Sequence, residues 1–258
     1  MPSLWSMSTT VRNSNRIRSF MIVLQQLNGR AWNVQTQREY QILLIQYRMY
    51  HPKVWHQFMA NPALTFNEAE AIFDAQNYVD PPMRGRQSMN PLKKLGLVEI
   101  DLGGRINITQ SGWNVINGTL GLEAPMLDWA FVDFGANIKP YVATLRFINE
   151  VDLIEGSGNG ISYEEFGYFV MTIYHYTQIA NQVQLLIQSR NNNIVRDNHK
   201  NHIQQAYENF YNFNDYLDNN IRYLRQSDLL DIQGDRIRLN YNRIADITNI
   251  IINDNASV

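Results

Sequence analysis

Apolar residues recur at steps of three and four along the front of the chain, which is the spacing of an amphipathic helix. Three such runs cover roughly residues 14–28, residues 33–51 and a stretch that starts near residue 67. Asn13 or Ser14 can cap the first run, because a short polar side chain accepts a hydrogen bond from the first helical turn. The front of the chain is therefore predicted to be helical.

The most informative stretch comes next, where the spacing changes from helical to alternating. It predicts a helix that ends at Gly96, a strand Leu97–Asp101, a tight turn at Gly103–Gly104 and a second strand Arg105–Thr109. Two consecutive glycines supply the positive φ angles of a two-residue hairpin turn. A helix capped by Ser111 is expected to follow. The order helix, hairpin, helix is the winged-helix pattern.

The same order returns near the end of the sequence. After a helical segment, the pattern predicts a strand Leu229–Ile232, a turn Gly234–Asp235, a strand Arg236–Leu239 and a closing helix Tyr241–Ile252. The two stretches align with a single gap, in the turn, and the second strand of each hairpin begins with Arg-Ile. This agreement indicates a repeat of one structural unit within the chain.

We therefore predict a mainly α protein with small β-hairpins, built from two winged-helix-like DNA-binding subdomains in tandem. The first is expected to span residues 1–122 and the second residues 123–258.

Between the two hairpins the pattern predicts three further helices. They lie near residues 127–134, at residues 138–151, and at residues 163–175 behind a Ser162 cap. The polar stretch Asn191–His202 is expected to be an exposed loop or linker.

Net charge hides an uneven distribution of charge along the chain. The 258 residues carry 22 basic and 24 acidic side chains, a net charge of −2. Residues 1–118 hold 12 basic and 7 acidic residues, a net of +5, whereas residues 119–194 hold 3 and 8, a net of −5. A basic front half is what a nucleic-acid-binding face needs, although a solvated helix face can produce the same asymmetry.

Composition narrows the chemistry further. The sequence has no Cys, which excludes disulfides, thiolate metal sites and Cys nucleophiles and fits a reducing cytoplasm. Asn and Gln number 48, and 17 of the 22 basic residues are Arg. Arg suits phosphate and guanine, and the amides suit adenine. An AT-rich genome also explains abundant Asn, but it would favour Lys as well.

Motifs for catalysis are missing from the sequence. The segment Glu155–Phe166 imitates a calcium loop, but Phe166 stands at the twelfth position, where a carboxylate is required. No acidic residue lies two positions before any Lys, as a metal-dependent nuclease would need. No phosphate-binding loop or dinucleotide fingerprint occurs. We expect no catalytic residue, no metal site and no cofactor in this chain, which leaves recognition.

The helix before each hairpin carries the side chains that read DNA. Such a helix can lie in the major groove, and Arg on the second hairpin strand suits phosphate or minor-groove contacts. A solvated face packed by Leu92 and Leu95 would show the same pattern. The candidates are Arg84, Arg86, Gln87, Asn90, Lys93, Lys94 and Arg105 in the first unit, and Asn219, Asn220, Arg222, Arg225, Gln226, Arg236 and Arg238 in the second.

Three parts of the sequence (residues 5–13, Trp32 and residues 83–97) resemble the N-terminal region of the AlwI-like type IIS restriction endonucleases, a family that includes nicking endonucleases. The resemblance extends to residues 160–166 and to the second hairpin, and it is looser after residue 190. It implies recognition of a short asymmetric site in double-stranded DNA, with cleavage outside that site by a separate C-terminal nuclease domain. That domain would hold Mg²⁺ in a PD-(D/E)xK site.

By this resemblance, Thr9, Thr10 and Arg12 fall in the N-terminal signature, where a DNA contact is expected. The sequence ends at Val258 without a PD-(D/E)xK trio. We therefore expect a DNA-recognition region that is a monomer on DNA in the bacterial cytoplasm, away from membranes, with its nuclease domain or subunit outside this chain.

Other functions remain open at this point. The chain can be a stand-alone winged-helix transcriptional regulator, which would usually dimerise on a palindrome. It can also be a protein–protein scaffold, or it can cleave DNA after all.

Overall fold

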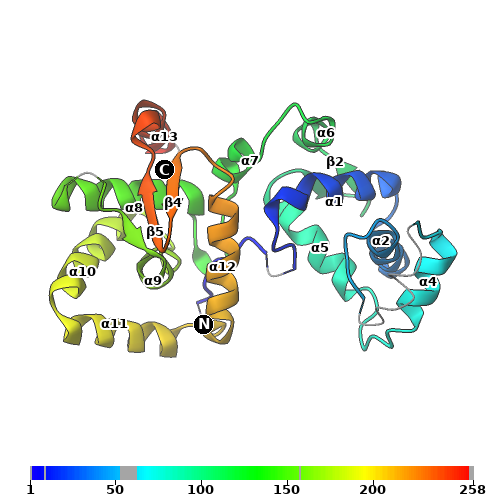
Figure 1. The fold of residues 1–258 in the computed structure, drawn as a ribbon, viewed down its shortest axis with the longest axis horizontal. Coiled ribbons are helices and arrows are strands. Elements are labelled where there is room, and N and C mark those ends of the chain that lie inside the picture. Colours follow the sequence, from blue (N-terminus) through cyan, green and yellow to red (C-terminus); the bar gives the residue numbers. More distant parts are fainter. Residues whose placement is uncertain (1, 9, 53–62, 157, 256–258) are drawn as a thin grey trace. The chain divides into compact units, whose positions relative to one another are not determined.

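The computed structural model contains two compact units, and helices dominate both, as predicted (Figure 1). The N-terminal unit consists of residues 10–121, and the C-terminal unit consists of residues 1–9 together with residues 122–258. Within the residues described, no helix is both long and apolar enough to cross a membrane. The structure describes residues 2–8, 10–52, 63–156 and 158–255.

The N-terminal unit places its hairpin between helices, as the sequence pattern predicts. Asn13 caps a 3-10 turn that leads into the first helix, and the side chain of Asn33 accepts from Thr36 N to cap the second. The elements are α1 (Ile17–Leu24), α2 (Val34–Gln46), α4 (Phe66–Asp74), α5 (Met83–Lys94), β1 (Val98–Ile100), β2 (Ile106–Ile108) and α6 (Gln110–Asn117).

The turn of this hairpin differs from the predicted two-residue turn. Asp101 N donates to Arg105 O at 2.9 Å, so the loop between them has three residues, Leu102–Gly104. In this loop only Gly104 has a positive φ, of 72°. A three-residue loop that ends in a left-handed glycine is a common hairpin connection, and it also fits the right-handed twist of the strands.

The helix after the hairpin begins earlier than predicted. Thr109, and not Ser111, is its N-cap, because the Thr109 hydroxyl accepts from Gly112 N at 3.1 Å. Ser111 lies inside α6.

A short extended segment, residues 29–32, pairs with the hairpin and was not predicted. Gly29 N donates to Ile106 O at 2.7 Å, and Ile106 N donates back to Arg30 O at 2.9 Å. Trp32 N donates to Gly104 O at 2.8 Å. The connection between α1 and α2 therefore forms a third, irregular edge beside β2.

The C-terminal unit joins its helices to a three-stranded antiparallel sheet in the order β3-β5-β4 (Figure 1). Ile161 pairs with Ile237 across β3 and β5, and Ile232 pairs with Ile237 across β4 and β5. The elements are α7 (Glu123–Asp128), α8 (Pro140–Glu155), β3 (Ile161–Ser162), α9 (Tyr163–Glu165), α10 (Ile179–Asn191), α11 (Asn193–Ala206), α12 (Phe213–Leu224), β4 (Leu230–Gln233), β5 (Arg236–Leu239) and α13 (Ile244–Asn255).

Two predicted helices have different limits. The helix expected near residues 127–134 is wrong over most of its length, because α7 ends at Asp128 and Phe131 pairs with Ile138 in an isolated bridge. Ser162 caps α9 as predicted, but the helix continues as a π-helical turn over Phe166–Val170 and does not reach His175.

The prediction of a loop or linker at Asn191–His202 is wrong, because nearly all of this stretch is helical. The Asn192 side chain accepts from the backbone of Ile194 and Val195 and so caps α11. Only His199 and Ile203 are buried within α11, and the His199 ring stacks on Phe169 at 4.4 Å between centroids. With so narrow a buried face, the sequence shows little helical periodicity.

Residues 2–8 belong to the C-terminal unit, although they begin the chain. Trp5 is buried and makes edge contacts with Trp129 and Phe166, at 6.0 and 5.6 Å between ring centroids. Asn220 holds this segment from α12, since its side chain accepts from Met7 N at 3.0 Å and donates to Trp5 O at 3.1 Å. The first residues therefore complete a core that is built mostly from the second half of the sequence.

The two units share one order of elements. In each, a helix (α1 or α8) leads to an extended segment that pairs with the second hairpin strand (the 29–32 segment or β3). Further helices follow, α2 and α4 in the N-terminal unit and α9, α10 and α11 in the C-terminal unit. Then come the helix before the hairpin (α5 or α12), the hairpin, and a closing helix (α6 or α13). The closing helix contacts the first helix in both units.

Helices α2 and α5 approach so closely that only glycine fits at position 85. A Cβ on Gly85 would lie 2.2 Å from Gln37 O. We predict that Gly85→Ala lowers the free energy of unfolding of the N-terminal unit by about 1–3 kcal/mol, the usual cost of overpacking, although alanine is the better helix former. Gly121→Ala is the matched control, because a Cβ there meets nothing within 4 Å. Urea unfolding followed by circular dichroism measures both, and equal stabilities would contradict the close packing.

Candidate nucleic-acid interface

Helix α5 presents one polar face away from the core of its unit. Successive residues of a helix are rotated by about 100°, so residues three and four apart share a face. Those on one side are buried: Gly85, Ser88, Met89, Pro91 and Leu92. The opposite side, called the α5 face below, consists of Arg86, Gln87, Asn90, Lys93 and Lys94.

Arg86 is held in place by two partners that sequence analysis did not identify. Its guanidinium forms an ion pair with Asp80, in the loop before α5, and donates from Nη1 to Gln37 Oε1 at 3.3 Å. The Arg86 side chain remains 41% exposed. A guanidinium that is fixed but accessible loses less side-chain entropy on binding a base or a phosphate than a free one does.

Gln87 can act mainly as a hydrogen-bond donor. Its Oε1 accepts from Arg84 Nη1 at 3.2 Å and from Thr10 Oγ1 at 3.1 Å, which occupies both lone pairs of the amide oxygen. Reading adenine requires the amide oxygen and the amide nitrogen together. In this arrangement Gln87 is suited to guanine or phosphate oxygens, and Arg84 and Thr10 serve to position it.

Asn90 and Lys93 are the most accessible polar groups of the α5 face. Both are exposed, and neither side chain has a hydrogen-bond or ion-pair partner among the described residues. Lys94 is exposed beside them. Asn90 has both its oxygen and its NH₂ available for an adenine edge, and the lysines suit phosphates.

Of the remaining candidates of the N-terminal unit, two are exposed, and one of these also stabilises the fold. Arg12 is exposed, and Thr9 lies outside the described residues. Arg105 is exposed but donates from Nη1 to Gly29 O at 3.0 Å, so it also holds the 29–32 segment against the hairpin.

Two candidates on α12 belong to the core and not to a DNA-facing surface. Asn219 is 0% exposed and donates to Asp215 O at 2.8 Å, while Asn220 is 2% exposed and holds the N-terminal segment. Buried amides of this kind satisfy backbone groups that would otherwise lack partners. The sequence composition indicated polar residues on α12, but not that these two face inward.

The outward face of α12 mixes charges. Arg222 pairs with Asp218 at 2.9 Å, and Arg225 donates to the hydroxyl of Tyr163 at 2.6 Å. With Asn214 and Leu217, these residues line a hollow of about 300 Å³. Tyr163, at the start of α9, was not a candidate, because no sequence pattern places it against α12. Gln226 is half-buried just after the helix.

The arginines of β5 lie next to a compact ion-pair cluster. Arg190 binds Glu165 through Nε at 2.7 Å and Gly160 O at 2.8 Å, and it also pairs with Glu155. Arg236 lies 3.7 Å from Glu165. Arg190 thereby ties α10 to the end of α8 and to the glycine-rich break before β3. Because Arg236 also pairs with Glu165, its guanidinium is only partly available to a ligand.

Arg238 has a different setting from Arg236 on the same strand. It is half-buried and stands opposite Asp231 across β4 and β5.

Burial alone would raise the pKa of Glu165, but the hydrogen bonds from Arg190 and from Ser162 N outweigh it and hold that pKa below its usual value. The Glu165 carboxylate is therefore ionised, and it stabilises the fold through these hydrogen bonds. Its Oε2 also accepts from Ser162 N to complete the cap of α9.

The described residues do not fit a magnesium site. Nowhere among them do three His, Cys, Asp or Glu side chains come together so that they could hold a metal ion. Glu155 and Glu165 do come together, but both bind Arg190.

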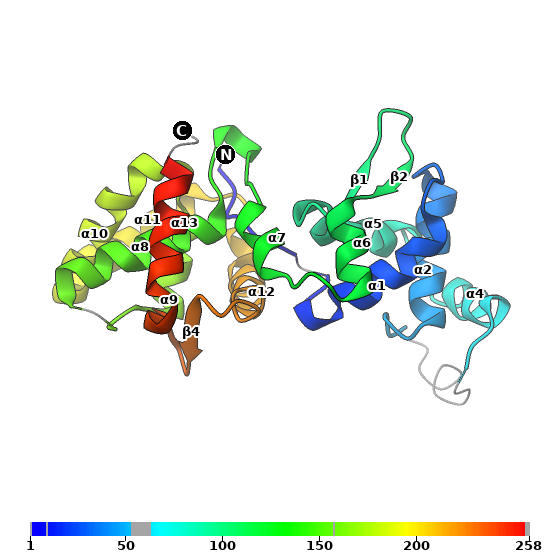
Figure 2. The same cartoon turned by 90° about the horizontal axis from the view of Figure 1, so that it is seen from above.

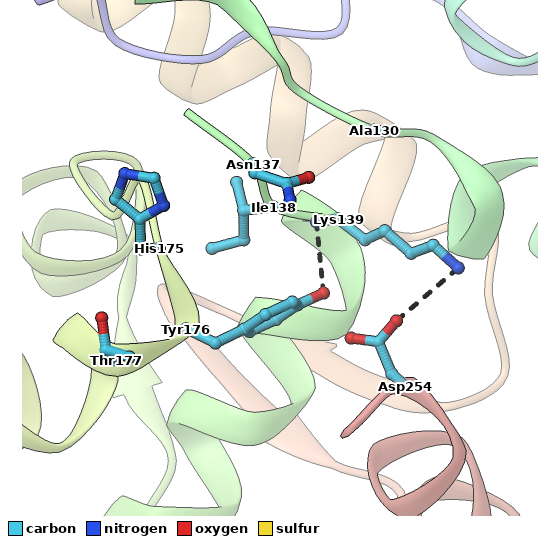
Figure 3. Close-up of a pocket in the computed structure, with 8 residues that line it drawn as sticks. All are labelled: Ala130, Asn137, Ile138, Lys139, His175, Tyr176, Thr177 and Asp254. Atoms are coloured by element: carbon cyan, nitrogen blue, oxygen red, sulfur yellow. Dashed lines mark hydrogen bonds and ion pairs between the residues drawn. The ribbon is translucent and has the colours of Figure 1, made fainter. Parts of the chain in front are cut away.

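A cavity of about 240 Å³ lies near the end of α13 (Figure 3). Lys139 points toward Asp254, with Nζ 3.6 Å from Oδ1, and the Tyr176 hydroxyl accepts from Lys139 N at 3.2 Å. Burial, and next the neighbouring Asp254, raises the pKa of Tyr176, which keeps its hydroxyl protonated. These contacts join the start of α8 to α13 and offer no base-reading arrangement.

Comparison with protein families identifies the C-terminal part of the chain. Residues 130–257 match the model of the AlwI restriction endonuclease family. Over this half, the chain belongs to the AlwI restriction endonuclease family. The match covers most of the C-terminal unit and lies outside residues 5–13 and 83–97, on which the sequence resemblance chiefly rests. A comparison with curated proteins finds no match to the chain.

The Arg190 cluster makes a testable prediction for this AlwI-family unit. Because the folded-state pKa of Glu165 is lowered, its contribution to stability is present above its ordinary pKa of 4.5 and is lost as pH falls through the folded value. We predict that Glu165→Gln lowers the free energy of unfolding at pH 7 by about 1–3 kcal/mol and flattens its decline in acid.

Glu164→Gln is the control, because Glu164 is exposed and pairs only with Lys200 at 2.6 Å among the described residues. Denaturant unfolding at several pH values from 3 to 7 measures both variants. An unchanged acid dependence in Glu165→Gln would show that the cluster does not stabilise the unit.

Proposed function

We propose that this chain recognises a specific sequence in double-stranded DNA for a restriction endonuclease of the AlwI family. The observation that carries the proposal is the α5 face, where two lysines, an arginine and two amides lie together on the helix that precedes a hairpin. In helix-turn-helix proteins, the helix in this position enters the major groove. The family match supplies the restriction endonuclease role.

We further propose that both units are winged-helix-like. Their shared order of elements supports this, including the extended segment that pairs with the second hairpin strand in each. The hairpins would then be the wings, and α5 and α12 the recognition helices.

The two proposed recognition helices are not equivalent. The α5 face is basic and includes Asn90 and Lys93, whose side chains have no partner among the residues that the structure describes. On α12, by contrast, the exposed Arg222 is paired with an acid and the two asparagines are buried. Two unlike surfaces in one chain suit an asymmetric site that is read by a monomer. We assign base reading chiefly to α5, and phosphate contacts to Arg222, Arg225 and Arg238.

Cleavage belongs, in this proposal, to a nuclease domain or subunit outside the described residues, which would bring its own Mg²⁺. Type IIS cutting outside the recognised site follows from that separation. A stand-alone transcriptional regulator is not favoured by the family match.

Selection of bound duplexes from a random pool tests the proposal. We expect enrichment of one short sequence without two-fold symmetry, bound by one chain per duplex, with affinity that falls steeply as salt rises. A palindromic sequence bound by two chains, or no enrichment, would contradict the proposed function.

Replacing single groups on the α5 face separates base contacts from phosphate contacts. We predict that Asn90→Ala weakens binding to the selected sequence by about 1–3 kcal/mol and relaxes the choice of base at one position. Lys93→Ala should weaken binding to all sequences alike and reduce the salt slope by about 1. Competition binding against single-base variants measures both effects.

Asn67→Ala is the matched control for Asn90, because Asn67 is an exposed asparagine on α4 of the same unit. Equal effects of the Asn90 and Asn67 replacements would remove α5 from the interface.

A further inference from the structure

The tip of the β1–β2 hairpin exposes an apolar side chain. Leu102 has a relative exposure of 110%, so its side chain packs against none of the described residues of the unit. The hairpin projects beyond the helices of the N-terminal unit (Figure 2). Leu102 is the first residue of the loop between its strands. Burying a leucine is favourable, and an exposed one adds nothing to the stability of the fold.

The loop that carries Leu102 is held firmly at its base. Gly104 N donates to Asp101 O at 2.9 Å, and Arg105 N donates to Asp101 Oδ1 at 2.8 Å. The 29–32 segment braces the hairpin from the side through Trp32 N, which donates to Gly104 O. A side chain on such a base is presented to a partner in a defined position, at a small cost in entropy.

The tip is also narrow. Gly103 and Gly104 follow Leu102 directly, so one side chain stands on a nearly bare stretch of backbone. The minor groove of DNA is about 6 Å wide and admits such a tip more readily than a loop with several large side chains. Exposed Arg105 lies beside the tip, and the Asp101 carboxylate, which accepts from Arg105 N, lies at the base of the loop and not at its tip.

The second hairpin lacks these properties. Its loop consists of Gly234 and Asp235, because Gln233 pairs with Arg236. Asp235 is exposed there, and a carboxylate at the tip is repelled by phosphates. The two hairpins thus differ at the position that would meet DNA first.

We propose that Leu102 is a wedge that enters the minor groove and partly unstacks one base step beside the sequence read by α5. This inference rests on the proposed DNA recognition and adds an indirect form of readout to it. Apolar side chains inserted from the minor groove unstack base pairs and kink the duplex. Pyrimidine–purine steps deform most easily, so Leu102 selects such a step without a hydrogen bond to its bases.

The test places 2-aminopurine, whose fluorescence rises when it is unstacked, at successive positions of the duplex selected from the random pool. We expect the wild-type chain to raise the fluorescence severalfold at one position, beside the bases that Asn90 contacts. Leu102→Ala should abolish this rise and weaken binding by less than about tenfold, while Leu102→Met should retain it. Replacing the unstacked step by a purine–pyrimidine step should lower the DNA affinity of the wild type more than that of Leu102→Ala.

Leu153→Ala is the matched control, because Leu153 is 78% exposed on α8 of the other unit. Binding without a fluorescence rise at any position, or an equal rise with Leu102→Ala, overturns the wedge and leaves the proposed recognition standing. Failure of the wild-type chain to bind any duplex overturns both.

Discussion

Pairing of a short connecting segment with the second strand of each hairpin is the constraint on which the two units depend. In the N-terminal unit, Ile106 exchanges backbone hydrogen bonds with the 29–32 segment, and in the C-terminal unit Ile161 pairs with Ile237. Backbone groups beside a core need partners, and each segment supplies them while it ties the first two helices to the hairpin. The helix before the hairpin is then packed from behind, and its polar face is left toward solvent.

Packing of the two helices that precede the hairpins decides which of their polar side chains stay accessible. Because Gly85 has no side chain, α5 packs directly against α2 at Gln37. Gln37 and Asp80, which lies in the loop before α5, can then both bind the Arg86 guanidinium. On α12, by contrast, Asn220 turns inward to hold residues 2–8, and the face that remains is neutralised by Asp218. One helix keeps its side chains available, while the other uses several of its own for the fold.

Much of this architecture follows from local signals in the sequence. Gly96, the glycines of the turns and the alternating isoleucines predict both hairpins, and the basic residues before the first hairpin predict the α5 face. The 29–32 segment and β3 escape prediction, because pairings of two or three residues across a long stretch of sequence leave no periodic pattern. Helix α11 was not predicted, because only His199 and Ile203 are buried within it and the rest of the helix is mostly polar. Asn219 and Asn220 show that a polar amide in the helix before a hairpin can face the core, which the sequence pattern did not indicate.

The absence of Cys from the sequence makes a direct test of DNA recognition by both units possible. A DNA-cleaving iron chelate is attached to the single Cys of Asn90→Cys or of Arg222→Cys, and each labelled chain is bound to the selected duplex. If both helices face the DNA, each label cuts the duplex at one place, and the two places differ and are not related by two-fold symmetry. Cuts that are symmetric about the centre of the site, or no localised cutting from either label, would contradict recognition of an asymmetric site by the two units.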